Sequence, residues 1–119
     1  MSDLTPKGTL MTIDGVERKF LFTFSVIDAL QSEFNEPIDT IMSEYLADTA
    51  EGQMVDLMKK TTKILEVFTG IEKGHFDNFV TSQNVYPIAY ALVKEYGYDL
   101  PEMDEDDEDN DPNMASGQQ

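Results

Sequence analysis

Residues 9–34, TLMTIDGVERKFLFTFSVIDALQSEF, contain two alternating runs that meet at Asp14-Gly15, and the second run leads into a helical pattern. Asp-Gly between alternating apolar residues predicts a β-hairpin with a two-residue type I′ loop, because both central residues of that loop need positive φ. The register that follows pairs Ile13 with Val16, Met11 with Arg18, and Thr9 with Phe20. An isolated hairpin is marginal in water, so we expect this one to pack on the helices that follow.

The two faces of the predicted hairpin differ in character, because successive side chains of a strand point to opposite faces. The face expected to join the core carries Met11, Ile13, Val16, Phe20, Phe22 and Phe24. Arg18 also falls on this face, and we expect it at the rim with its aliphatic stem buried. The opposite face is mixed, and Leu10 and Leu21 are expected to remain partly exposed on it.

Five helical segments are predicted after the hairpin, from apolar residues that recur at the spacing of one helical face. Their ranges are 26–34, 37–47, 53–69, 73–81 and 85–96. Ser25 and Asp28 provide an S-x-x-D start for the first helix. The predicted fold class is α+β, mostly α: an N-terminal β-hairpin packed on a bundle of about five helices. We assign residues 1–100 to this single domain and residues 101–119 to a disordered acidic tail.

The charge of the chain is strongly negative, with a formal value of −16 over 119 residues. Eight acidic residues and no basic residue lie between Glu102 and Asp111, which is typical of a disordered tail. Such a charge disfavours binding to nucleic-acid phosphates and to anionic membranes. There is no cysteine, no apolar leader and no membrane-length apolar run, so we expect a soluble cytoplasmic protein.

The sequence contains no pattern that predicts an enzyme, a cofactor or a metal site. An EF-hand loop that began at Asp104 would need Gly at its sixth position and Glu at its twelfth, where Asp109 and Ala115 stand. His75 is the only histidine, and we expect it to be a surface residue, since no catalytic partner can be identified for it. No phosphate-binding glycine loop and no nucleophile elbow are present.

Four apolar or aromatic residues are the candidates for contact with a protein partner. Leu10 and Leu21 are candidates because a lone hairpin leaves them uncovered. Tyr86 and Tyr90 lie in the last predicted helix, with Tyr90 outside its apolar stripe. They form either an exposed aromatic patch or a half-buried edge of the core, since tyrosine suits both positions. Met42, Met54 and Met58 lie on helical stripes and are expected to fill the core.

The hairpin that runs directly into a helix resembles the start of the tail assembly chaperones of long-tailed, siphovirus-type bacteriophages. The resemblance rests on the Asp14-Gly15 turn, on the alternating Phe20, Phe22 and Phe24, and on the helix that opens at Ser25. It extends over roughly residues 9–96 in the order of elements, and the acidic end fits it. It implies a non-enzymatic protein that transiently binds the tape measure protein and helps to recruit tail tube subunits, without remaining in the mature particle.

Two other functions are compatible with the same residues. A small acidic helical protein can act as a DNA mimic that inhibits a host nucleic-acid-binding protein, provided that its charges lie on a folded surface. A small structural virion protein, such as a connector, is the third candidate. The sequence also leaves self-association open.

Overall fold

The hairpin forms the first part of the fold in a computed structural model that describes residue 4 and residues 6–98. Strand β1 (Thr9–Ile13) pairs antiparallel with β2 (Val16–Phe20) in the predicted register. Asp14 and Gly15 have φ values of 57° and 78°, the positive values that a type I′ loop requires. The predicted hairpin and its loop are therefore confirmed. The acidic tail predicted for residues 101–119 lies outside the described residues.

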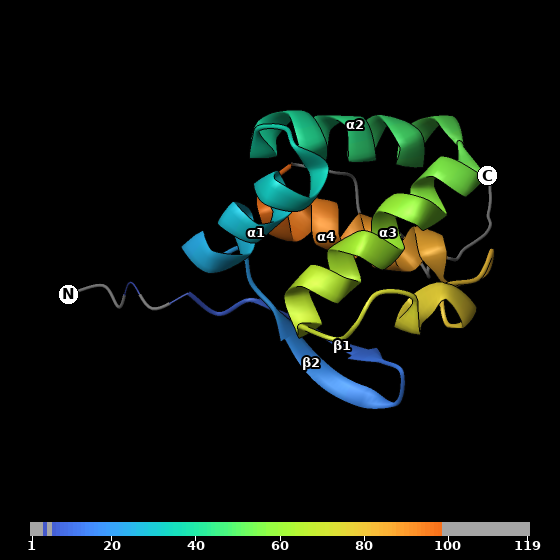
Figure 1. Cartoon of the computed structure of the whole chain (residues 1–119), viewed down its shortest axis with the longest axis horizontal. Helices are drawn as coiled ribbons and strands as arrows, with labels where there is room; N and C mark the ends of the chain where they lie inside the picture. Colours follow the sequence, from blue (N-terminus) through green and yellow to red (C-terminus); the bar gives the residue numbers. More distant parts are fainter. Residues whose placement is uncertain (1–3, 5, 99–119) are drawn as a thin grey trace, which may run out of the picture.

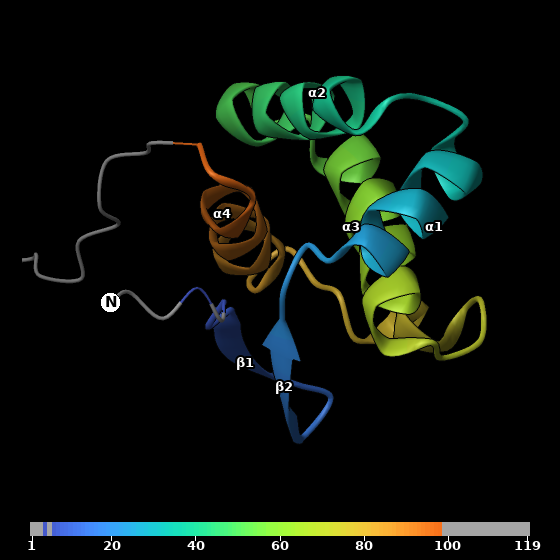
Figure 2. The same cartoon turned by 90° about the vertical axis from the view of Figure 1, so that its left-hand side faces the viewer.

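Four α-helices and one 3₁₀ turn follow the hairpin within residues 6–98: α1 (Phe24–Phe34), α2 (Ile38–Glu51), α3 (Met54–Thr69), η1 (His75–Asn78) and α4 (Val85–Tyr96). Helix α3 is central, because it packs against α1, α2, α4 and η1. The helices gather on one side of the hairpin (Figures 1 and 2). The predicted class, a β-hairpin packed on a helical bundle, is confirmed with four α-helices in place of five.

One core joins the hairpin to the helices. Ile13 and Phe20 enter it from the hairpin, and the ring of Phe20 contacts that of Phe68 on α3 edge-to-face, with 5.1 Å between ring centres. The predicted helical stripes supply most of the rest. The buried apolar residues are Ile13, Phe20, Leu30, Ile41, Met42, Tyr45, Leu57, Ile64, Leu65, Phe76, Val80, Val85, Ile88, Ala89, Leu92 and Val93.

The alternating phenylalanines do not share one face, which corrects the prediction for Phe24. Strand β2 ends at Phe20, and the N–H of Thr23 then donates to the carbonyl of Leu21 in a tight turn. This turn interrupts the alternation, so Phe22 is half-buried while Phe24 is 82% exposed at the start of α1. Val16 was also predicted to be core and is 49% exposed, although its cross-strand partner Ile13 is buried.

Three predicted helices also need correction. Helix α2 continues to Glu51, four residues beyond the predicted end at Ala47, and Gly52 in the left-handed conformation follows it. Helix α1 begins at Phe24, and its N-cap is Thr23, whose Oγ1 accepts the N–H of Val26; Ser25 was the predicted start. The predicted helix over residues 73–81 is only the single 3₁₀ turn η1. Gly74 precedes that turn with a left-handed φ of 89°, which no right-handed helix can include.

Candidate protein-binding groove

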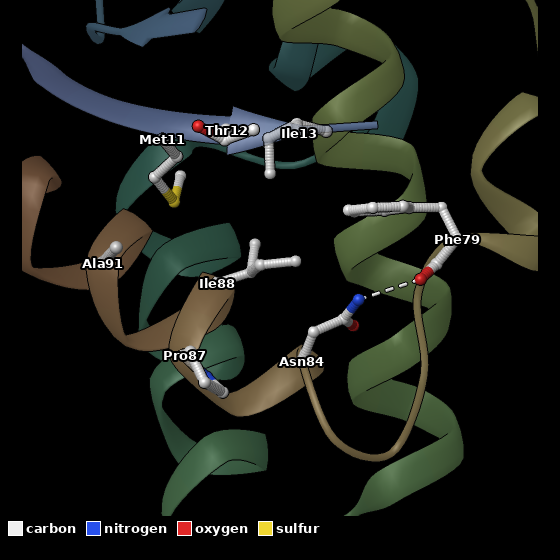
Figure 3. Close-up of a pocket in the computed structure, with 8 residues that line it drawn as sticks. All are labelled: Met11, Thr12, Ile13, Phe79, Asn84, Pro87, Ile88 and Ala91. Carbon is white, nitrogen blue, oxygen red and sulfur yellow. Dashed lines mark hydrogen bonds between the residues drawn. The ribbon is translucent and has the colours of Figure 1, made fainter. Parts of the chain in front are cut away.

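Strand β1 and helix α4 lie beside each other, although more than seventy residues separate them in the sequence. At the β1 start, the hydroxyl of Thr9 donates to the carboxylate of Glu95 near the end of α4. At the other end of the strand, the side chain of Ile13 points toward Phe79 and Ile88 (Figure 3). The strand therefore runs along the helix with its core-facing side chains directed at it.

A groove of about 360 Å³ lies between these two elements. Three consecutive residues of β1 form one wall, and the first turns of α4 with the ring of Phe79 form the other (Figure 3). Pro87 and Ala91 are small residues on the α4 wall, and their short side chains leave the space open. The groove is lined by Met11, Thr12, Ile13, Phe79, Asn84, Pro87, Ile88 and Ala91.

The side-chain amide of Asn84 forms hydrogen bonds with the backbone of the preceding loop. Its side-chain N–H donates to the carbonyl of Phe79 at 2.9 Å, and its side-chain oxygen accepts the N–H of Thr81 at 2.8 Å. Both bonds hold the loop before α4 against the start of the helix, and the dashed line in Figure 3 marks the bond from Asn84 to Phe79. None of the groove residues is titratable. The groove is therefore suited to holding apolar side chains.

A second hollow, of about 250 Å³, lies between α3 and the η1 region, lined by Met58, Lys59, Thr62, Asp77 and Val80. It carries two charged side chains, and it is smaller than the first. The groove beside β1 is therefore the better candidate for an apolar partner segment.

The structure does not bring the four predicted contact residues together. Leu10 is 62% exposed on the outer face of the hairpin, and Leu21 is half-buried just after β2. Tyr86 and Tyr90 are half-buried on α4, so edge packing describes them better than an exposed patch. Tyr86 lies beside Gly52 at the end of α2, and the Tyr90 hydroxyl is buried without a hydrogen-bond partner in the described chain. Their role in binding a partner remains a prediction.

The groove itself was not predicted, although the sequence contains a partial signal for it. Asn84, Ile88, Ala91 and Glu95 recur at the spacing of one helical face, beside the main core stripe of α4. Ala91 is the small residue on this face, and its short side chain leaves room next to the element that packs there. Only the fold reveals that β1 is the neighbour.

His75 is exposed, as predicted, and has one contact that the sequence did not indicate. Its Nε2 lies 2.7 Å from a carboxylate oxygen of Asp14, so η1 holds the hairpin turn from 61 residues away. Its ring also contacts the buried ring of Phe76 edge-to-face. Within residues 6–98, no group of three or more metal-ligating side chains comes together.

The charges of the folded part are separated along the chain. The described residues hold fourteen acidic and eight basic side chains, a formal charge of −6. Residues 20–58, which comprise α1, α2 and the start of α3, contain eight acidic residues and no basic one. The remaining described residues therefore have a formal charge of +2, and the folded negative charge belongs to the α1–α2 side.

No described helix has the combination of length and apolar character that crossing a bilayer requires. Comparisons of the chain with protein-family models, with curated proteins and with solved structures found no match.

Proposed function

We propose that this protein is a tail assembly chaperone of a long-tailed bacteriophage, which transiently binds the tape measure protein and helps to recruit tail tube subunits. The groove between β1 and α4 is the observation that carries the proposal. A holding protein needs an apolar surface that takes up side chains of a client and releases them without chemistry. A groove of about 360 Å³ with no titratable lining residue meets that need.

The resemblance of residues 9–34 to the start of that chaperone family supplies the identity of the client. A tape measure protein is a long polypeptide that aggregates when it is not covered. A chaperone with a formal charge of −16 would keep the complex of the two proteins soluble by like-charge repulsion between complexes.

Co-expression with the tape measure protein encoded by the same phage tests the proposal. We expect the soluble fraction of the tape measure protein to rise several-fold and the two proteins to co-purify. An unchanged soluble fraction, with no co-purification, would reject the chaperone function. Detection of this protein in purified mature particles would favour the structural virion alternative instead.

A second candidate, an acidic DNA mimic, is supported by the eight acidic residues of positions 20–58, which belong to the folded part of the chain. A mimic presents negative charge from a folded surface, so deletion of residues 101–119 would leave its affinity for basic DNA-binding proteins largely intact and strongly salt-dependent. The chaperone is also expected to retain most of its activity without this tail. The discriminating measurement is therefore binding to a panel of basic nucleic-acid-binding proteins, which a chaperone does not require.

A further inference from the structure

Strand β1 has one edge that the hairpin leaves unpaired. In a hairpin with a two-residue loop, pairs that exchange hydrogen bonds alternate with pairs that do not. Ile13–Val16 and Met11–Arg18 belong to the bonded set, so the N–H and C=O groups of Leu10 and Thr12 point away from β2. No backbone hydrogen bond outside the hairpin involves either residue in the described part of the chain.

This free edge borders the apolar groove. Met11, Thr12 and Ile13 line the groove, and no residue of β2 does. Leu10 and Thr12 are both exposed, so neither side chain covers the edge. Figure 3 shows the strand across one side of the space, with Ile88 and Phe79 on the other side. Unpaired backbone groups and an apolar hollow are therefore adjacent on one side of the hairpin.

We propose that a partner binds by adding an extended segment to the outer edge of β1 as a third strand. The backbone of the segment pairs with Leu10 and Thr12, and its alternate apolar side chains enter the groove against Ile88, Ala91 and Phe79. Strand addition of this kind takes affinity from main-chain hydrogen bonds and specificity from the pockets for alternate side chains. The inference deepens the proposed function and rests on it only for the identity of the client.

The charge of the chain selects the class of partner. A second copy has the same formal charge of −16, so like-charge repulsion between the two chains opposes the addition of β1 to β1 of another copy. The groove lining itself carries no charge, which favours an uncharged apolar centre in the bound segment. The formal charge of −16 on the whole chain attracts positively charged segments from a distance. The partner is therefore a β-prone apolar segment flanked by basic residues.

Two peptides test the mode of binding on the full chain: a Val-Thr-Val-Thr-Val peptide flanked by lysines, and the same peptide flanked by glutamates. We expect the lysine peptide to slow amide hydrogen exchange at Leu10 and Thr12 at least tenfold, with no change at Glu17 and Lys19 on the opposite edge. The glutamate peptide should bind at least tenfold more weakly at low salt. N-methylation of the lysine peptide at alternate residues should abolish its binding, without any change to the protein.

Two proline variants form a matched pair, because Thr12 and Glu17 lie opposite each other and both direct their N–H groups outward. Thr12→Pro blocks the groove edge and should lower peptide affinity at least tenfold. Glu17→Pro blocks the far edge and should leave the affinity within about twofold of the wild type. Circular dichroism checks that both variants fold. If either variant does not fold, the N-methylated peptide still tests the strand addition.

Several results would overturn the inference. Peptide binding without protection of Leu10 and Thr12, or equal effects of the two proline variants, would show that the edge is not used. Protection of both amides in the free protein would show that the edge is already occupied, by a second copy if sedimentation finds dimers and otherwise by the chain itself. If the tape measure protein stays soluble while Thr12→Pro has no effect, the proposed function stands and the strand addition fails. If the peptide binds at the β1 edge but the tape measure protein is not kept soluble, the strand addition stands and the proposed function fails.

Discussion

The hydroxyl of Tyr45 on α2 lies 2.6 Å from the hydroxyl of Thr61 on α3, and both side chains are fully buried. Each hydroxyl is the hydrogen-bond partner of the other at the centre of the helical core. The burial of Tyr45 raises its pKa above the ordinary value, because the charged phenolate would be desolvated. The pair joins the two longest helices by a polar contact within an apolar environment.

Removal of both hydroxyls of this pair should destabilise the protein by less than the sum of the two single removals. Tyr45→Phe or Thr61→Val leaves one buried hydroxyl unsatisfied, at a cost of about 1–2 kcal/mol. In the double variant no polar group is stranded, so the loss should fall short of the summed single losses by about 1 kcal/mol. Urea unfolding of the four proteins measures the coupling. Additive losses would mean that the two hydroxyls do not depend on each other.

Phe20 and Phe24 should respond very differently to truncation, although both belong to the same alternating run. Phe20 is 1% exposed and Phe24 is 82% exposed. Phe20→Ala should therefore cost about 3–5 kcal/mol, the range for a buried phenylalanine, and Phe24→Ala should stay within about 0.5 kcal/mol of the wild type. Thermal or urea unfolding compares them. Similar losses would place both rings in the core and contradict the turn at residues 21–23.

The stability of the protein should fall between pH 10 and pH 12 in a way that depends on Tyr96. Its hydroxyl donates to the carboxylate of Asp39, and this hydrogen bond, with a smaller contribution from burial, raises the pKa of Tyr96 from 10.0 to about 12. The folded state thus holds the proton more tightly than the unfolded state. The resulting stabilisation is present below pH 10 and is lost as the pH rises to 12.

Tyr96→Phe is the control for this loss, since Tyr45 also has a raised pKa and remains in the variant. Unfolding curves at several pH values should show a smaller decline for Tyr96→Phe than for the wild type. Ultraviolet titration should lack one ionisation near pH 12 in the variant. Coincident stability profiles of the two proteins between pH 9 and 12 would refute the assignment.

Obstruction of the groove should abolish client binding without unfolding the protein. Ala91 lines the groove and is half-buried, so the longer side chain of Ala91→Arg would occupy the space that is proposed to receive the client. We expect at least a tenfold loss of affinity for the tape measure protein, which corresponds to about 1.4 kcal/mol.

Ala47→Arg adds the same charge at an exposed position of α2 and should leave the affinity unchanged. Titration calorimetry or fluorescence anisotropy provides the comparison. An equal loss in both variants would attribute the effect to charge and not to the groove.

Sequence patterns predicted the structure correctly where it depends on residues close together in the chain. The Asp14-Gly15 turn fixed the hairpin register, and the apolar stripe of residues 85–96 gave α4 its observed limits. The same patterns failed where a short segment was compatible with two kinds of secondary structure. Phe24 continues the alternation of Phe20 and Phe22, yet the hydrogen bond from Thr23 to Leu21 ends the strand and turns Phe24 to solvent. Residues 73–81 carry apolar side chains, but Gly74 and the Asn84 contacts leave only one 3₁₀ turn.

The sequence by itself determined the hairpin, the stripes of the main helices and the negative charge, because each depends on residues a few positions apart. The groove was decided only by the tertiary structure. Its walls come from β1 and α4, which are more than seventy residues apart in the sequence and lie side by side only in the folded protein. The contact between Asp14 and His75 has the same origin, since no periodic pattern connects residues 61 positions apart.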